Sequence, residues 1–386
     1  MQDLNVQKLD HAFVERFETD ASLRAQARAS VVSWRWATES MGVDIPFSQA
    51  LYGGPRARWL RNESADPDNH VHHGLDAAGR IVLECERNRA ETVWLYGENS
   101  RTGVSWYLGD DSSSLKTIDL YQYQDQRLIS AQAHVSGRHT LRKTFTWQDG
   151  LLVKSFCQTE PEAGEPWCCQ HLFIHDPHRE LERIVLQYTD ADGVPSGQER
   201  LEYLRLPKGE TLATVEKRVE AHFLDALPRA LAAVPRDQPL YCLLLCYTAE
   251  DMASAWPPFL VWGQDAYRQQ IAAQGEDISY YLWAPDEIRE QQGRAYEYWF
   301  DAPELKNACL LHAQLMGMKQ NHASATRVLK RLMPAVARMV AEAGLPVTAD
   351  FVVSYADNSG YVDPLKAIKA GVSPEHWTAL KKQKFV

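Results

Sequence analysis

Between residues 75 and 206, short apolar or aromatic runs alternate with tight turns along the chain. The turn 76–79 (Asp-Ala-Ala-Gly) leads into the apolar run 81–85, and the aromatic run 144–147 ends in the turn 148–150 (Gln-Asp-Gly). Aspartate and glycine favour tight hairpin turns, and short apolar runs between such turns are typical of paired strands. This segment is therefore expected to fold as an antiparallel β-meander.

The residues after 206 follow a different pattern, with helical periods around isolated apolar runs. Leu240–Tyr247 is apolar or aromatic at every position, which is typical of a central strand buried on both faces. Residues 324–343 repeat apolar side chains at helical spacing, and Val328, Leu332 and Val336 fall on one side. This pattern predicts an α/β domain with a small sheet flanked by helices.

Breaks in these patterns predict the domain boundaries. Leu206-Pro207-Lys208-Gly209 interrupts the apolar alternation, and residues 62–74 are mostly polar. We therefore expect an α+β protein in three parts: an N-terminal helical and loop segment (1–74), a meander of repeat-like hairpins (75–206) and the C-terminal α/β domain (207–386).

A weak internal repeat runs through the predicted meander. The segments that begin at Tyr121, Phe145 and Leu172 are interpreted as sharing one plan, in which an aromatic-rich strand meets a turn with Asp and an aliphatic strand leaves it. This plan resembles the tyrosine–aspartate repeats of bacterial Rhs-type proteins, over about a third of the chain. The glycine-anchored form of that repeat is not kept here, so an open curved sheet is expected instead of a closed shell.

Residues 211–386 resemble a second bacterial family, a domain of unknown biochemical activity that recurs in polymorphic-toxin immunity loci. The likeness lies in the strand 240–247, the strand 350–353 and the tail 363–375, which ends in Ser-Pro-Glu. Together the two resemblances imply an immunity protein of a type VI secretion effector. Such a protein would bind and neutralise a cognate secreted toxin.

Composition and charge narrow the classes of function. The 386 residues include 41 Lys+Arg and 51 Asp+Glu, for a net charge of −10. This balance argues against direct nucleic-acid binding, because affinity for the phosphate backbone comes mostly from cationic side chains. The sequence offers no membrane-spanning run and no signal-like start, and its seven cysteines are interpreted as reduced thiols. A cytoplasmic protein without membrane contact is expected.

Two groups of potential metal ligands occur, at His70-Val71-His72-His73 and at Cys168-Cys169-Gln170-His171. Closely spaced imidazoles can share a metal, so a metal-dependent hydrolase built on His70, His72 and His73 is one alternative function. However, the histidines are not followed by an acidic residue at a spacing familiar from metallohydrolases. A structural zinc site normally needs two spaced pairs of ligands, and the sequence has no Cys-x-x-Cys pair to match Cys168 and Cys169. A histidine cluster in a solvated loop and buried thiols are the preferred interpretations. No metal or other cofactor is predicted.

Motifs for nucleophilic or nucleotide chemistry are also missing from the sequence. It contains no Gly-x-Ser-x-Gly, no phosphate-binding loop and no Gly-x-Gly-x-x-Gly. An enzyme is therefore not expected. A stripe of aromatic residues remains, and it either packs across strands or forms an exposed face for a protein or a sugar: Trp94, Tyr96, Trp106, Tyr107, Tyr121, Tyr123, Phe145 and Trp147. A carbohydrate-binding protein is thus a second alternative.

Acidic residues recur at the tips of the predicted hairpins. They are Asp110, Asp111, Glu160, Glu162, Asp190 and Asp192. Each tip alone is typical of a solvated turn, but together on one edge they could attract a basic partner. Nucleases need basic clefts. These six residues are therefore the predicted contact residues for a nuclease toxin, which the protein would inhibit by steric occlusion.

Overall fold

Two units, Met1–Tyr203 and Leu204–Val386, make up the computed structural model of the chain. The structure describes residue 9 and the ranges 11–18, 22–43, 45–53, 56–63, 66–86, 89–109, 113–136, 139–161, 165–251, 255–292 and 296–386. The sequence places its second boundary between residues 206 and 207, and the packing divides the chain between Tyr203 and Leu204.

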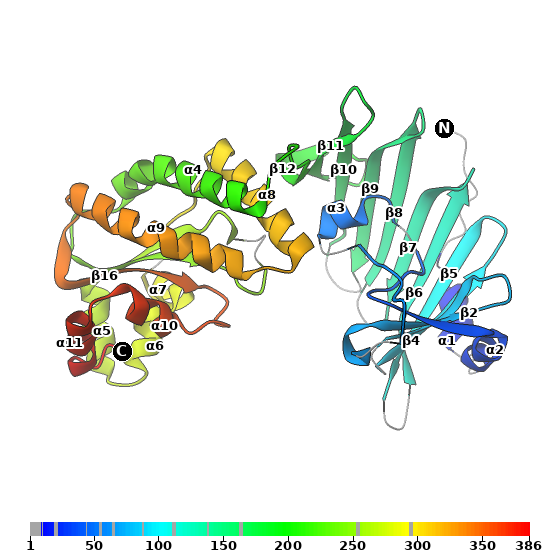
Figure 1. Cartoon of the computed structure of the whole chain (residues 1–386), viewed down its shortest axis with the longest axis horizontal. Helices are drawn as coiled ribbons and strands as arrows, with labels where there is room; N and C mark the ends of the chain where they lie inside the picture. Colours follow the sequence, from blue (N-terminus) through cyan, green and yellow to red (C-terminus); the bar gives the residue numbers. More distant parts are fainter. Residues whose placement is uncertain are drawn as a thin grey trace. The chain divides into compact units, whose positions relative to one another are not determined.

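The first unit is a twelve-stranded antiparallel sheet whose strands follow one another in chain order (Figure 1). The strands are β1 (Ser33–Ala37), β2 (Val71–Leu75), β3 (Ile81–Glu86), β4 (Ala90–Tyr96), β5 (Ser100–Leu108), β6 (Ser113–Gln124), β7 (Arg127–Val135), β8 (His139–Gln148), β9 (Leu151–Pro161), β10 (Trp167–His175), β11 (Leu181–Thr189) and β12 (Pro195–Leu204). β1 and β12 stand at opposite ends of the order, so the sheet is open. The predicted antiparallel meander is confirmed.

The segment before residue 75 adds two strands to this sheet. β1 pairs with β2, and β2 pairs with β3. The interpretation of His70–His73 as part of a solvated loop is therefore wrong for most of that segment, because Val71–Leu75 forms β2 and only His70 precedes it. A short 3-10 helix, η1 (Pro67–Asn69), lies just before it.

Helices cover both faces of this sheet. α1 (His11–Glu18) and α2 (Leu23–Ser30) pack on one face, against apolar side chains that include Leu83, Val104 and Leu120. We call this the α1/α2 face. α3 (Ser48–Tyr52) and the residues before it pack on the other face. There the ring of Phe47 stacks on that of Phe173 at 5.4 Å. We call this the α3 face.

The second unit has a four-stranded sheet between two layers of helices. The strand order is β15 (Glu297–Tyr298), β14 (Phe259–Gln264), β13 (Leu240–Tyr247) and β16 (Val347–Asp357). One core joins the sheet to α4 (Leu212–Ala233), α8 (Pro303–Lys319) and α9 (Ala323–Glu342). A second core joins it to α5 (Asp265–Gln274), α6 (Ile278–Trp283), α7 (Pro285–Gln292), α10 (Pro364–Gly371) and α11 (Pro374–Lys382).

β13 has the central place that its apolar sequence predicts. All eight of its residues are buried, and it pairs antiparallel with β14 and parallel with β16. The predicted α+β class, with a small sheet flanked by helices, is confirmed. Among the described residues, none of the helices is both long and apolar enough to cross a bilayer.

Candidate functional site

The histidines of the predicted metal cluster have separate structural roles. His73 is fully buried and lies 3.0 Å from Glu84, directly across from it on β3. Burial raises the pKa of Glu84, but the His73 contact and the Ser40 hydroxyl outweigh it and leave that pKa below its usual value. His72 instead stacks against Trp36, with ring centroids 4.3 Å apart. Since His72 and His73 are successive residues of a strand, they point to opposite faces and do not form one ligand set.

No group of three or more His, Cys, Asp and Glu side chains in the described ranges has a geometry that could hold a metal ion. His171 and Cys169, from the second candidate group, alternate with Cys168 and Gln170 along β10. Cys169 lies opposite another thiol, Cys157, and not opposite a further histidine. Cys157, Cys169 and His171 form part of the wall of a cavity, which is described below.

The predicted acidic contact residues lie partly in described segments. Glu160 is near the end of β9 and lies 3.7 Å from Arg142. Asp190 forms the turn after β11, where its carboxylate accepts hydrogen bonds from the backbone of Asp192 and Val194 at 3.0 and 2.8 Å. Asp192 is exposed in the same turn. Asp110, Asp111 and Glu162 lie outside the described residues.

Register places the described acidic residues at one end of the sheet. Thr159, next to Glu160, pairs with Trp167, and Cys168 pairs with Thr189, next to Asp190. The structure therefore brings Glu160 and the 190–192 turn to the same end, two strands apart.

Most of the aromatic stripe packs inside the first unit. Trp94, Trp106 and Phe145 are buried, and Tyr107 is the member of the stripe with a largely exposed ring. Cross-strand packing thus accounts for most of these residues. Other exposed aromatic side chains, those of Tyr52, Trp167 and Tyr188, lie elsewhere, around a cavity on the α3 face.

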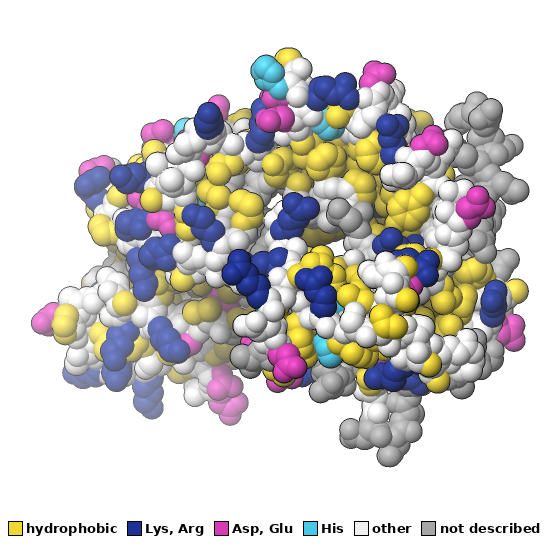
Figure 2. All heavy atoms as spheres, turned by 45° about the vertical axis from the view of Figure 1, so that its right-hand side comes forward, with side chains coloured by type: hydrophobic (Ala, Val, Ile, Leu, Met, Phe, Trp, Pro, Cys, Tyr) yellow, Lys and Arg dark blue, Asp and Glu magenta, His cyan; other side chains and the backbone are white. Residues whose placement is uncertain are grey.

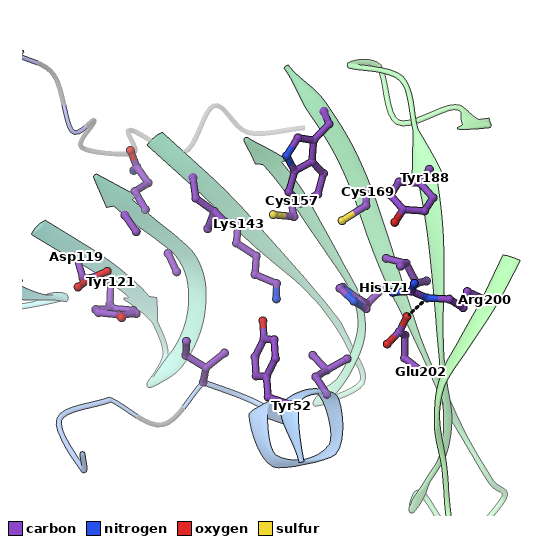
Figure 3. Close-up of a pocket in the computed structure, with 18 residues that line it drawn as sticks. Tyr52, Asp119, Tyr121, Lys143, Cys157, Cys169, His171, Tyr188, Arg200 and Glu202 are labelled. Atoms are coloured by element: carbon purple, nitrogen blue, oxygen red, sulfur yellow. Dashed lines mark hydrogen bonds and ion pairs between the residues drawn. The ribbon is translucent and has the colours of Figure 1, made fainter. Parts of the chain in front are cut away.

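This cavity has a volume of about 430 Å³ and lies between α3 and strands β6 to β12 (Figure 3). Apolar side chains such as Ile45, Leu51, Leu141 and Leu186 form much of its wall. Its polar lining residues are Tyr52, Asp119, Tyr121, Gln132, Lys143, Cys157, Cys169, His171, Tyr188, Arg200 and Glu202.

One row of paired residues crosses the floor of the cavity. Successive pairs in the strand register are Tyr121–Ala131, Ala131–Lys143, Lys143–Cys157, Cys157–Cys169 and Cys169–Tyr188. Directly paired residues of neighbouring strands project from the same face, so six strands, β6 to β11, deliver these side chains to one surface. Lys143 is the cation of this row.

The Lys143 side chain is buried without a carboxylate beside it among the described residues. Only 7% of the residue is exposed. Within the part of the chain that the structure describes, no carboxylate forms an ion pair with its ammonium group; its contacts are with two aromatic rings, Tyr52 at 6.0 Å and Phe145 at 5.9 Å. The amine extends into the cavity above Tyr52 (Figure 3). An ammonium group in such surroundings is costly unless an anion joins it.

The thiols beside Lys143 respond to its charge. A hydrogen bond from Cys169 and the positive charge of Lys143 lower the pKa of Cys157 to about 7, against the opposing effect of burial. The same hydrogen bond raises the pKa of Cys169. Cys157 therefore has thiolate character near neutral pH, although it is buried.

The other basic groups of the cavity add no unpaired positive charge, whereas Asp119 is still mostly ionised at pH 7. Burial lowers the pKa of His171 to about 4, so its imidazole is neutral at pH 7. Arg200 is paired with Glu202. Burial raises the pKa of Asp119 to about 6. Lys143 thus remains the one cavity cation without a carboxylate partner among the residues described.

A second polar cluster, in the second unit, is structural. His312 Nε2 lies 2.8 Å from the Ser324 hydroxyl, which donates to Glu216, and all three are buried among α4, α8 and α9. Arg327 and Arg331 close the cluster by pairing with Glu216. Because the Ser324 hydroxyl donates its hydrogen bond to the Glu216 carboxylate and is inaccessible, this arrangement is not that of an activated nucleophile.

Sequence reasoning missed Lys143 and Tyr52. A signal for Lys143 exists: in the run 141–145, Leu141, Lys143 and Phe145 occupy alternate positions and so share one face of β8. A lysine between two large apolar side chains on an inward face is unusual. Tyr52 carries no such signal, because its place over the cavity depends on how α3 docks.

No protein-family model matches this chain, and a comparison with curated protein sequences finds no match.

Proposed function

We propose that this protein is an immunity protein that binds a cognate toxin, most simply a nuclease with a basic cleft, and occludes it without catalysis. The proposed contact surface is the acidic–aromatic end of the first unit, defined by Glu160, Trp167, Tyr188, Asp190, Asp192 and Val194. The protein would act in the cytoplasm of the producing cell. The two sequence resemblances support the class, and the arrangement of this end supports the surface.

The observation that carries the proposal is the exposure of large apolar side chains beside carboxylates. Trp167 is 46% exposed, Tyr188 48% and Val194 59%. Tyr188 pairs with Cys169, two residues from Trp167 on the same face, so the two rings are neighbours. Aromatic side chains that remain accessible in a free protein are typical anchors of protein interfaces.

Negatively charged side chains lie beside these aromatic anchors. Asp190 and Asp192 are exposed in the turn after Tyr188, and the whole chain carries a net charge of −10. A nuclease cleft must be basic to hold a phosphate backbone, so acidic groups around an aromatic contact would speed association and compete with nucleic acid.

The proposal can be tested by a rescue assay. The product of the neighbouring gene would be expressed in a sensitive bacterium with and without this protein. We expect co-expression to restore viability and the two proteins to purify as a complex. Persistent toxicity despite soluble co-expression would refute immunity against that neighbour.

The surface is tested on the purified complex. Replacing Trp167 and Tyr188 by Ala should weaken the complex by about 30-fold or more, the effect expected for interface hot spots. Asp192→Lys should slow association chiefly at low salt. Tyr280→Ala, at an exposed tyrosine of α6 in the second unit, is the matched control. Unchanged affinity for the Trp167 and Tyr188 variants would exclude this surface.

A further inference from the structure

We propose that the cavity on the α3 face is a binding site for a small monocarboxylic acid with an apolar body, whose carboxylate pairs with Lys143. This site does not depend on the proposed immunity function.

The first step of the argument is the unsatisfied charge. Lys143 is only 7% exposed, and its ammonium meets two aromatic rings but no carboxylate among the described side chains. A buried cation without a partner is unfavourable, whereas the same cation paired with a bound anion forms a strong, charge-assisted contact. Among the described residues, the cavity therefore lacks a carboxylate paired with this ammonium group, and a ligand can supply one.

A second polar atom lies close to that position. Nδ1 of His171 is buried and has no hydrogen-bond partner in the described structure. His171 and Lys143 reach the same cavity, and the charge of Lys143 acts on the imidazole. A neutral imidazole with its proton on Nδ1 can donate to one carboxylate oxygen while the ammonium holds the other. Two donors that reach the same cavity can hold the two oxygens of one carboxylate.

The remaining lining limits the ligand to a single charge. Arg200 is already paired with Glu202, and the Asp119 carboxyl also lines the cavity. A ligand with two or more negative charges, such as a phosphate ester, would find one available cation and the Asp119 carboxyl as an acidic neighbour. A monoanion avoids this repulsion.

Shape and polarity define the rest of the ligand. The volume of about 430 Å³ is within the range of roughly 300–1,000 Å³ that small-molecule sites occupy. Ile45, Leu51, Leu141 and Leu186 form an apolar wall that cannot satisfy a polar body. Hydrophobic side chains also gather on the visible surface of the first unit (Figure 2). An aliphatic or aromatic acid satisfies both requirements.

Matched ligands separate the role of charge from that of apolar contact. The full chain would be titrated with octanoate, with 1-octanol and with the dicarboxylate suberate, by calorimetry and tryptophan fluorescence. We expect saturable one-to-one binding of octanoate, at least about tenfold tighter than that of 1-octanol or suberate. Equal affinity for octanoate and 1-octanol, or no saturable binding of octanoate, would overturn the proposal.

Variants assign the preference to Lys143. Lys143→Met keeps the length and apolar stem of the side chain, and it should reduce the preference for octanoate over 1-octanol to less than about threefold. Lys154→Met is the matched control: Lys154 is a half-buried lysine on β9 at odd spacing from Cys157, which places it on the opposite face. A preference that survives in Lys143→Met would contradict the assignment.

A second variant tests the cavity without altering its charge. Ala133→Phe fills the space from β7 and should abolish binding of both octanoate and 1-octanol. Circular dichroism and the melting temperature would confirm that each variant is folded. Octanoate binding that persists in folded Ala133→Phe would show that the ligand lies elsewhere and would overturn the proposal.

Discussion

Three hairpin turns of the first unit repeat one set of hydrogen bonds. Asp76, Asp176 and Asp190 each accept, through one carboxylate oxygen, the backbone N–H groups two and four residues later. In each turn the fourth residue has a positive φ: Gly79 at 75°, Arg179 at 69° and Gly193 at 80°. The aspartate supplies the acceptor, and the fourth position supplies the left-handed backbone that closes the turn.

Gly193→Ala is expected to destabilise the first unit by about 1 kcal/mol, because an L-residue is strained at this positive φ. A Cβ at this position would be 3.9 Å from Phe156, which is an ordinary contact, so the effect reports backbone conformation and not a clash. The midpoint of urea unfolding measures it. Ala191→Ser, in the same turn and at negative φ, should stay within about 0.5 kcal/mol. Equal effects of the two changes would contradict the assignment to φ.

These turns could be predicted from sequence because their causes are local. In the turns at Asp76 and Asp190, a glycine three residues after the aspartate supplies the permitted φ, whereas the turn at Asp176 has Arg179 at that position and lacks this signal. Lys143 is different. Its alternation with Leu141 and Phe145 is visible in the sequence, but its lack of a counter-ion depends on β7, β9 and α3, which are distant in the chain. The sequence therefore indicates that the lysine is unusual without locating the cavity.

Strands β3 to β11 could be predicted because each joins an apolar pattern to a turn signal, whereas β12 begins with Pro-Ser-Gly-Gln-Glu-Arg and has no such pattern there. β1 and β2 are harder to predict. Val-His-His-Gly-Leu has no period of two in hydrophobicity, and the alternation in Ser-Trp-Arg-Trp-Ala extends over only two aromatic residues. The first three residues of β1, at the end of the sheet, are exposed, so the strand needs little apolar alternation. The pairing of β8, β9 and β10 places Lys143 on one side of Cys157 and Cys169 on the other, so the register brings a positive charge next to the Cys157 thiol.

Cys157 is expected to react with iodoacetamide before Cys85 at pH 7, although Cys85 is the more exposed thiol. The pKa of Cys157 is lowered to about 7, whereas burial and the nearby Glu91 raise the pKa of Cys85 to about 11. At pH 7 about half of Cys157 and roughly one in ten thousand of Cys85 are thiolate, which is the reactive form. Mass spectrometry of the labelled peptides measures the order.

The position of Lys143 beside Cys157 also predicts how the rate of iodoacetamide labelling depends on pH. The labelling rate of Cys157 should rise as pH increases through about 7 and level off above it. Lys143→Met removes the positive charge that favours the thiolate, so it should move the midpoint to higher pH. A midpoint that stays in place, or faster labelling of Cys85, would show that Lys143 does not act on this thiol.

On the scale of the whole molecule, each unit has cores of its own. Leu83, Val104 and Phe145 belong to cores in the first unit, whereas Phe223 and Leu243 belong to the second. The apolar run of β13 predicts a buried strand in the second unit. Its parallel partner β16 begins about a hundred residues later in the chain, so the sequence does not reveal this pairing. Strand order in a meander follows chain order and is easier to predict than strand order across helical crossovers.

Separate cores predict separate responses to cavity-forming substitutions. Phe223 is fully buried in α4, with its ring centroid 4.8 Å from that of Phe300. Phe223→Ala should cost the second unit about 3–5 kcal/mol. Amide hydrogen exchange should then accelerate in β13 and α4 and remain unchanged in β6 to β9. Phe173→Ala, at a buried phenylalanine on β10, is the matched change in the first unit and should give the reverse pattern. If either substitution lowers protection equally in both units, they do not unfold independently.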